Sequence, residues 1–321
     1  MLGTRLASRL NSFAGGLGGK PSVLQMAARA ATVPGLTDVD LNYPDHVAEN
    51  PATLAARLGD LGLRVNGLAM RYYANPAFRL GAFTHPDRAV RREAIDLTRA
   101  GIDAAMAMGA PLVTIWLGQD GFDTSFQADY ARLWDDEVSA LREVAAHDPA
   151  CLLSVEYKPN EPRAFALLPD LATTLIALAD VGAPNTGVTL DFAHLLYAGE
   201  MPAMAAATVA RRSRLLGVHL NDGWAKRDDG LMVASVHLPA TLELLWQLLR
   251  DGWEGVLYFD TFPDASGLDP VAEATANVET VGRLLAVARG LAGSAELDAA
   301  RASQDAAAAL RVVNRALMGG P

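Results

Sequence analysis

The apolar positions of the 321-residue chain form short, nearly continuous runs that alternate with longer segments of helical spacing. Runs such as LVTIWL, LLGVHL and GVLYF contain almost no charged residue, which is typical of parallel strands covered on both faces. The runs predict eight strands, at Arg5–Phe13, Thr37–Asn42, Arg64–Met70, Leu112–Leu117, Leu152–Tyr157, Gly187–Leu190, Leu215–Leu220 and Gly255–Phe259.

Helix-length segments lie between these runs. The clearest are Pro86–Met108, Pro169–Val181 and Leu238–Arg250, and the first two end at a glycine, which is a common helix stop. Eight strand–helix units over about 290 residues predict an α/β fold, the (β/α)8 TIM barrel. The alternative is a doubly wound sheet, but the glycine-rich loop Gly15–Gly19 after the first strand lacks the G-x-G-x-x-G spacing of such sheets.

The alternation of predicted strands and helices ends about 30 residues before the end of the sequence. We expect a (β/α)8 catalytic domain over residues 1–290 and an Ala-rich helical extension over residues 291–321. The extension is not needed to close a barrel. A packed terminal helix and an arm that embraces another subunit both fit its composition.

Composition narrows the classes of partner. The net charge of −10 and the pI of about 5.1 argue against a nucleic-acid partner. No apolar run approaches the roughly 20 residues that span a bilayer. The single cysteine, Cys151, rules out an internal disulfide. The N-terminus is basic and free of acidic residues, as transit peptides are, but it fits a first strand better. We therefore expect a cytoplasmic protein with no membrane or nucleic-acid partner.

Polar residues stand at or near the carboxyl end of each of the last four predicted strands. Glu156 is the next-to-last residue of the fifth strand, Asp191 follows the sixth, His219 lies near the end of the seventh and Asp260 follows the eighth. A lone Asp at a strand end is more often the cap of the next helix. Polar residues at the ends of four successive strands are less easily explained as independent caps. Converging buried carboxylates repel one another unless a cation neutralises them. Oxygen ligands with one imidazole favour Mg²⁺, Mn²⁺ or Co²⁺.

A second cation site is also indicated. His194 comes three residues after Asp191, and the loop after the seventh strand adds Asp222, Asp228 and Asp229. Two cations that share Asp191 would clamp adjacent oxygens of a polyol. The alternative is that Asp228 and Asp229 are simply a solvated pair in a loop.

The segment EYKPNEPR at residues 156–163 resembles the signature of the xylose isomerase and L-rhamnose isomerase families. The segments LDFAH, GVHLNDG and FDTF follow in the order and spacing of those enzymes, so that the resemblance extends from Leu112 to Pro263. It implies an aldose–ketose isomerase that acts on a small sugar by a hydride shift between C1 and C2, with two divalent cations (Mn²⁺, Mg²⁺ or Co²⁺). We further expect a homo-oligomer, either a dimer or a tetramer.

The resemblance also implies roles for individual residues. The first cation would bind Glu156, Asp191, His219 and Asp260, and the second would bind Asp191, His194, Asp228 and Asp229. Lys158 would stabilise charge on the terminal oxygen of the sugar. Asp228 and His46 join Lys158 as candidate catalytic groups, while Trp116 and Asp222 are candidate substrate contacts.

One departure from the family pattern concerns ring opening, which the family performs with a histidine at the end of an early strand. Here Asn42 stands near that place, and His46 follows four residues later. His46, His85 from a nearby loop, or a metal-bound water are the candidates that the sequence leaves open. An open-chain or different substrate is a further alternative.

Other functions are possible on the same barrel. A ketose 3-epimerase would use catalytic glutamates on strands five and eight, whereas strand eight here ends in Asp260 and Lys158 has no obvious duty. A metal-dependent nuclease would need more ligands and a basic groove, against which the net charge argues. A non-catalytic sugar-binding barrel would show an incomplete set of metal ligands. The isomerase is therefore the favoured hypothesis.

Overall fold

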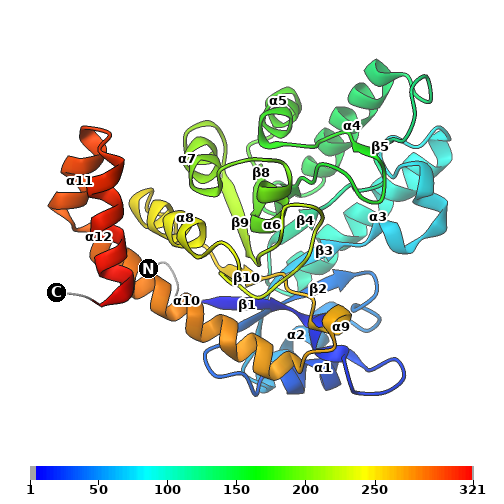
Figure 1. The fold of residues 1–321 in the computed structure, drawn as a ribbon. Helices are drawn as coiled ribbons and strands as arrows, with labels where there is room; N and C mark the ends of the chain where they lie inside the picture. The colour runs from blue at the N-terminus through cyan, green and yellow to red at the C-terminus, as the bar shows by residue number, and fades with distance from the viewer. Residues whose placement is uncertain (1–4, 320–321) are drawn as a thin grey trace.

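A closed barrel of eight parallel strands forms the centre of the protein (Figure 1). The computed structural model describes residues 5–319, except for the side chains of residues 264 and 265. The first four residues of the predicted barrel domain and the last two of the extension lie outside the described residues. Around the barrel the order is β1-β10-β9-β8-β6-β4-β3-β2, which confirms the predicted (β/α)8 fold and excludes an open doubly wound sheet. The strands are β1 (Leu6–Arg9), β2 (Asp38–Tyr43), β3 (Arg64–Met70), β4 (Leu112–Ile115), β6 (Leu152–Glu156), β8 (Thr186–Asp191), β9 (Leu215–Leu220) and β10 (Leu257–Phe259).

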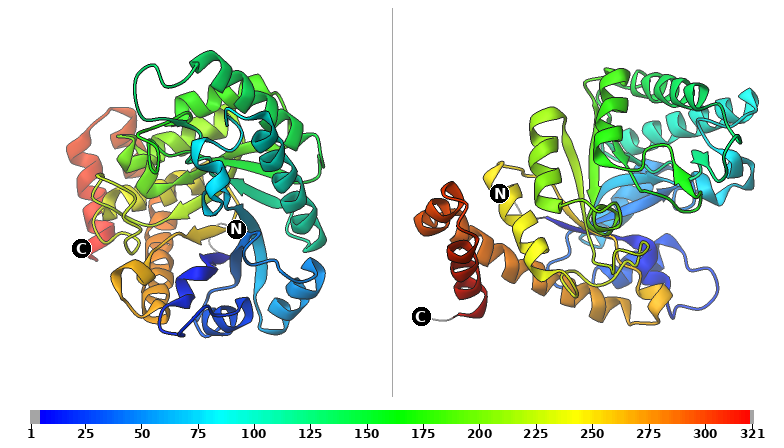
Figure 2. Two further views of the ribbon diagram at one scale, coloured as in Figure 1. Left: turned by 90° about the vertical axis from the view of Figure 1, so that its right-hand side faces the viewer. Right: turned by 45° about the horizontal axis from the view of Figure 1, so that its top comes forward.

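Helices surround the strands on the outside of the barrel (Figure 2). The α-helices are α1 (Val23–Ala30), α2 (Pro51–Asp60), α3 (Arg88–Ala107), α4 (Tyr130–Ala145), α5 (Leu171–Val181), α6 (Phe192–Tyr197), α7 (Pro202–Arg212), α8 (Leu238–Arg250), α9 (Pro263–Ser266), α10 (Pro270–Ala292), α11 (Ala295–Ala302) and α12 (Ala306–Met318). Short 3-10 helices are η1 (Leu10–Ala14), η2 (Tyr72–Ala74) and η3 (Pro76–Leu80). No helix among the described residues is both long enough and apolar enough to cross a membrane.

The predicted elements agree closely with the observed ones where periodicity is strong. The bounds of β3, β9 and α8 are those predicted. The first strand was predicted to extend to Phe13, but β1 ends at Arg9 and the chain continues as η1. Leu10 and Phe13 are both fully buried in this turn. A short apolar run does not distinguish a buried strand from a buried helical turn, which is why the prediction was too long.

A two-stranded antiparallel pair joins the loops that follow β4 and β6. It consists of β5 (Gly121–Phe122) and β7 (Phe165–Ala166). Gly121 has a φ of 153°, and a Cβ atom at this position would collide with the Phe165 carbonyl. Glycine is therefore required for the two backbones to approach. The pair holds the loops that carry Trp116 and Lys158 next to each other.

The residues after the barrel are helical, as predicted, and form two helices. Both α11 and α12 lie at one side of the barrel, where α12 packs on α10 and α11 (Figure 1). Arg250 of α8 forms an ion pair of 3.0 Å with Asp298 of α11. The Arg301 guanidinium stacks 4.5 Å from the centre of the Trp246 ring on α8. These contacts fix the extension against the last helices of the barrel.

Candidate active site

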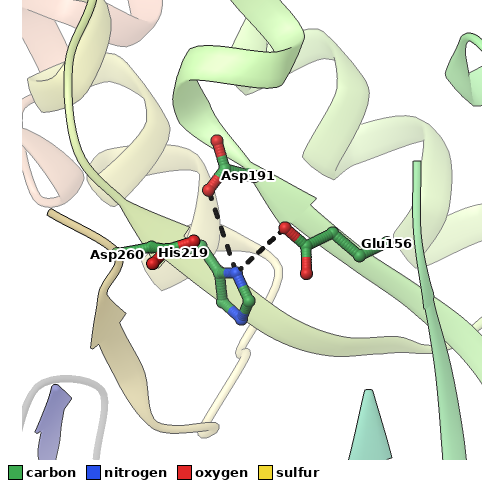
Figure 3. Close-up of side chains that lie close together, drawn as sticks. All are labelled: Glu156, Asp191, His219 and Asp260. Atoms are coloured by element: carbon green, nitrogen blue, oxygen red, sulfur yellow. Dashed lines mark ion pairs between the residues drawn. The ribbon is translucent and has the colours of Figure 1, made fainter. Parts of the chain in front are cut away.

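Four side chains meet at the carboxyl ends of neighbouring strands in the second half of the barrel (Figure 3). They are Glu156 from β6, Asp191 from β8, His219 from β9 and Asp260 directly after β10. One possible ligand atom from each residue lies within 4.8 Å of the others. These are the four residues that the sequence predicted to come together, and they do so in the structure.

The register of the strands explains this convergence. Asp191 pairs with His219 across β8 and β9, and His219 pairs with Tyr258 across β9 and β10. In a parallel barrel the carboxyl ends of all strands lie on one face, so residues at matched register surround the same axis. The apolar residues that precede each ligand are buried and fix the backbone from which the ligand projects.

His219 provides a test of whether a cation fits this cluster. Its Nδ1 atom lies 3.5 Å from Glu156 Oε1 and 3.8 Å from Asp191 Oδ2, directions that Figure 3 marks with dashed lines. This atom is buried, and no described residue forms a hydrogen bond with it. Buried polar atoms without a partner are rare in native proteins. A nitrogen and several carboxylate oxygens facing one point suit a hard or borderline divalent cation.

The pKa values of the four clustered residues also indicate that the cluster lacks a counter-charge. Burial raises the pKa of Asp191 to about 7 and also raises the pKa of Asp260. Burial also opposes the ionisation of Glu156, but the charges of His219 and His194 outweigh the effect of burial and lower the pKa of Glu156 to about 2. Burial lowers the pKa of His219, whereas Glu156, Asp260 and Asp191 raise it to a net value of about 9. A bound cation would replace these protons as the counter-charge.

A second histidine stands on the other side of Asp191. His194 Nε2 lies 3.9 Å from Asp191 Oδ1 and 3.2 Å from Asp228 Oδ2. The two oxygens of Asp191 thus face two different histidines. The other oxygen of Asp228, Oδ1, is buried and has no hydrogen-bond partner among the described residues. His194 Nε2 therefore lies between Asp191 and Asp228, and these are three of the four residues predicted for the second cation.

Lys158 reaches the same region from the loop after β6. Its Nζ atom lies 2.8 Å from Glu161 Oε2 and 3.2 Å from Asp228 Oδ2, and the side chain is only 7% exposed. Burial lowers the pKa of Lys158, but Asp228 and Glu161 more than compensate, so that its pKa is raised above the usual value. The residue is therefore a fixed ammonium cation. Glu161, which holds it, was not among the predicted site residues, although it lies within the EYKPNEPR segment.

One aromatic ring lies over this ammonium group, and a second ring packs against the first. Lys158 Nζ lies 5.2 Å from the centre of the Trp116 ring, within the range of a cation–π contact. The Tyr73 ring meets Trp116 edge to face, at 5.4 Å between centroids. Trp116 thus stands at the cavity as an aromatic wall, in the place that the sequence predicted. Tyr73 was not predicted, because its neighbourhood reads only as an aromatic pair after the third strand.

The cluster opens into a cavity of about 310 Å³. Glu156, His219, Asp260, His194, Asp228, Lys158 and Trp116 all line it. The remaining wall of the cavity comes from residues that were not predicted from the sequence: Arg9, Asp40, Ala69, Arg71, Tyr73, Thr114, Tyr258 and Phe262. Most of these lie in the first half of the chain, where no motif marks them. Asp40 is a charged residue within a strand, but β2 also contains Asp38, so the sequence does not distinguish it.

Two predicted loop residues are directed elsewhere. The Asp222 carboxylate is fully buried and accepts hydrogen bonds from the backbone amides of Val236 and His237, at 2.8 and 2.7 Å. The Asp229 carboxylate accepts from the Trp224 amide at 2.8 Å and from Arg227 Nε at 2.9 Å. Neither residue lines the cavity. Both carboxylates stabilise the loop after β9, so the structure does not support Asp222 as a substrate contact or Asp229 as a ligand in this arrangement.

The two candidate ring-opening histidines also lie outside the cavity. His46 is buried, and its Nδ1 accepts a hydrogen bond from the Asn42 amide at 3.1 Å. Burial and the charge of Arg71 lower its pKa to about 4. His85 Nδ1 accepts from the Asp87 amide at 3.0 Å. Each imidazole is used to fold a loop, and the structure therefore places neither at the site of the predicted chemistry.

Comparison with known proteins agrees with this geometry. A family model described as "Xylose isomerase-like TIM barrel" matches residues 28–281. The xylose isomerase of Thermus thermophilus is 29% identical over 209 residues, which is 63% of this chain and 54% of that protein. The chain thus spans about half the length of the curated relatives that it matches.

Solved structures show the same barrel. A structure of L-ribulose 3-epimerase has a TM-score of 0.72 and 19% identity, and covers 91% of this chain and 99% of its own. The D-psicose 3-epimerase of Clostridium cellulolyticum, with D-tagatose, has a TM-score of 0.67 and 14% identity, and covers 88% of this chain and 99% of its own. At these identities the likeness shows the fold alone.

Proposed function

The chain belongs to the xylose isomerase-like TIM barrel family, and we propose that it interconverts an aldose and a ketose by a hydride shift between C1 and C2. One observation carries the proposal. The Lys158 ammonium lines the same small cavity as Glu156, His219 and Asp260, three members of the cluster that Asp191 completes. This combination supplies a fixed positive charge beside a site for cations, which is what a carbonyl needs when negative charge develops on its oxygen.

In the proposal, Glu156, Asp191, His219 and Asp260 hold one divalent cation. His194 and Asp228 hold a second, with Asp191 between the two, and Mg²⁺, Mn²⁺ or Co²⁺ suits both donor sets. When bound, such cations polarise substrate oxygens and neutralise charge that develops on them. Asp229 is no longer included, because its carboxylate is committed to the Trp224 amide and to Arg227.

Lys158 has the clearest role among the residues of the chain itself. Asp228 and Glu161 hold its ammonium group in one position, so that little reorganisation is needed when substrate binds. We assign it to the terminal oxygen of the sugar, where an oriented donor stabilises developing negative charge. Trp116 lies over the ammonium group, and we assign to it the part of keeping water away from the carbon atoms between which the hydride moves.

The principal alternative is a ketose 3-epimerase. The solved structures named above favour it only as far as the shared barrel does. Against it, β10 is followed by Asp260 rather than a glutamate, and Asp260 is close enough to the other ligands to be used by the cation. Lys158 would have no evident part in removing a proton from C3. The isomerase therefore accounts for more of the cavity than the epimerase does.

An isotope experiment separates these two reactions. The purified protein, loaded with Mn²⁺, is incubated with a panel of aldoses deuterated at C2, with and without EDTA. The proposal expects conversion that requires the metal and leaves deuterium at C1 of the ketose product. A parallel panel of ketoses carries deuterium at C3. Loss of that label to water, with no aldose formed, would establish the epimerase and overturn the isomerase.

Two further expectations from the sequence stay predictions. We expect a dimer or tetramer, which sedimentation analysis of the purified protein would test. We also expect a cytoplasmic location, with a small sugar as the substrate and no nucleic-acid or membrane partner.

A further inference from the structure

A carboxyl group in the cavity has no part in the assigned chemistry. Asp40 lies in the middle of β2, lines the same cavity as Lys158 and Glu156, and is 5% exposed. It does not belong to the group of four possible ligands. Around the closed barrel, β2 lies opposite β8, the strand that ends in Asp191. A substrate held by the cluster would therefore have Asp40 on its other side.

The contacts of Asp40 leave one of its oxygens available. Asn66 Nδ2 donates a hydrogen bond of 2.8 Å to Oδ1. No described residue forms a hydrogen bond with Oδ2, and no described Lys, Arg or His nitrogen lies within 4.0 Å of the carboxylate. The amide of Asn66 thus fixes the orientation of a carboxyl group that lines the cavity.

A neighbour on the same strand shows that this arrangement is not required by the fold. Asp38 lies two residues earlier, on the same face of β2. Its carboxylate forms an ion pair with Arg5, accepts from Thr37 Oγ1 at 2.6 Å and accepts from Arg64 at 3.3 Å. Asp38 is therefore fully engaged below the cavity. Asp40 is the carboxyl group of β2 that lines the cavity, and its bond to Asn66 uses only Oδ1.

The proposed reaction has a requirement that the cavity must meet. Pentoses and hexoses are almost entirely cyclic in water, and a hydride shift between C1 and C2 needs the open-chain carbonyl. His194 and His219 are the histidines that line the cavity, and both belong to the proposed cation sites, while His46 and His85 lie outside it. Lys158 and Asp228 neutralise each other.

We propose that Asp40 is the catalytic acid–base group that opens the cyclic sugar, an inference that rests on the proposed isomerase function. Oδ2 accepts the proton of the anomeric hydroxyl as the C1–O bond to the ring oxygen breaks and the carbonyl forms. The electron pair of the broken bond stays on the ring oxygen, which takes up the proton that Asp40 returns. The step conserves all atoms and leaves Asp40 in its starting state.

The environment of Asp40 suits a group that accepts and returns a proton. Burial raises the pKa of Asp40 to about 7, although the hydrogen bond from Asn66 and the charge of His219 act to lower it. An acid–base group works best when its pKa lies near the working pH. Ala69 and Thr114, which have small side chains, line the same cavity of about 310 Å³.

The test uses Asp40→Asn in the Mn²⁺-loaded full chain, with Asp45→Asn as the matched control. Asp45 is an exposed carboxyl in the loop that follows the same strand and does not line the cavity. Activity is measured on a cyclic pentose or hexose and on erythrulose and dihydroxyacetone, whose carbonyls are too close to their hydroxyls to form stable rings. Metal content and thermal melting are recorded for each variant.

We expect Asp40→Asn to lose about 100-fold or more in kcat/KM on the cyclic sugar, the usual weight of a general acid–base group. On the acyclic ketoses it should keep at least about a third of the wild-type value, with its metal content unchanged. Equal losses on both kinds of substrate would assign Asp40 to general positioning and overturn the inference. A wild-type chain that converts no sugar at all would instead overturn the isomerase proposal itself.

A measurement on the wild-type chain does not depend on the variant. Freshly dissolved crystalline α- and β-anomers are each supplied at high enzyme concentration. If Asp40 opens the ring, turnover of at least one anomer exceeds its spontaneous rate of ring opening. Turnover that never exceeds the spontaneous rate for either anomer, in an active enzyme, contradicts the inference.

Discussion

The two halves of the barrel contribute to the cavity in different ways. From β6 to β10, each strand of the barrel ends in or near a side chain that can bind a cation. From β1 to β4, the strands supply walls instead: Arg9, Asp40, Ala69, Arg71, Thr114 and Trp116. A cation needs several ligands at fixed mutual distances, which adjacent strands provide. A substrate needs a surface of matching shape, which many residue types can provide.

This contrast teaches which half would hold the cations and which half shapes the space for the substrate. The ligand half shares a motif with a whole family, and its donor atoms lie within 4.8 Å of one another. The wall half carries no such motif. We therefore expect changes in the ligand half to abolish reaction on every sugar, and changes in the wall half to alter it selectively or to affect stability alone.

The largest expected effect is that of Glu156→Gln. It removes a charged ligand and leaves the other carboxylates to repel one another without a cation, so metal and activity should be lost together, on the order of 1,000-fold for turnover. Metal analysis and an isomerase assay check this. Glu49→Gln, an exposed change after β2, is the control. Full metal content in Glu156→Gln would contradict the proposed first site.

Lys158→Met should lower turnover by about 100-fold or more while the protein keeps its metal, because it removes one oriented electrostatic stabiliser. Steady-state kinetics on an accepted sugar, together with metal analysis, provides the measurement. Lys226→Met, an exposed lysine of the loop after β9, serves as the control. A fully active Lys158→Met would show that the assigned role is wrong.

Asp228→Asn should weaken the second site and leave the first intact. We expect the affinity for the second cation to fall by about 10- to 100-fold. Titration with Mn²⁺ followed by calorimetry measures the two sites separately. Asp229→Asn is the matched comparison. It should leave the second site unchanged, because the Asp229 carboxylate accepts hydrogen bonds from the Trp224 amide and Arg227. A loss of the second cation in Asp229→Asn alone would restore the ligand set predicted from sequence.

The smallest effect on activity is expected for Glu137→Gln, in α4 next to the wall half. Glu137 is fully buried, and neither carboxyl oxygen has a hydrogen-bond partner among the described residues. Burial, with the charges of Asp120 and Asp136, raises the pKa of Glu137 well above its usual value. The folded state therefore favours the protonated form of Glu137. Its contribution to stability is fully present below the unfolded pKa of 4.5 and is lost as the pH rises through the folded pKa.

The neutral amide removes this dependence. Glu137→Gln should melt higher than the wild type at pH 8, by about 2–4 °C per kcal/mol gained, and the difference should disappear near pH 4. Differential scanning calorimetry at both pH values checks the sign. A variant that is less stable at pH 8 would indicate that the ionised carboxylate is stabilised in a way the structure does not show.

Much of the ligand half could be predicted from the sequence because local pattern and chemistry agree there. Each ligand follows a continuous apolar run, and parallel strands place such positions on one face. The loop aspartates could not be assigned in the same way. A carboxylate in a loop can cap backbone amides or face a cavity, and Asp222 and Asp229 do the former while Asp228 does the latter.

The wall half shows the converse. Asp38 and Asp40 stand two residues apart on one strand with the same alternation, and nothing local distinguishes them. Among the described residues, Asp38 meets Arg5 and Arg64, whereas Asp40 accepts a hydrogen bond from Asn66 and lines the cavity. The sequence by itself determined the barrel and the meeting of Glu156, Asp191, His219 and Asp260, because periodicity and strand ends are local properties. Which other carboxylates face the cavity was decided only by the tertiary structure, because it depends on the partners that distant strands and loops bring to each oxygen.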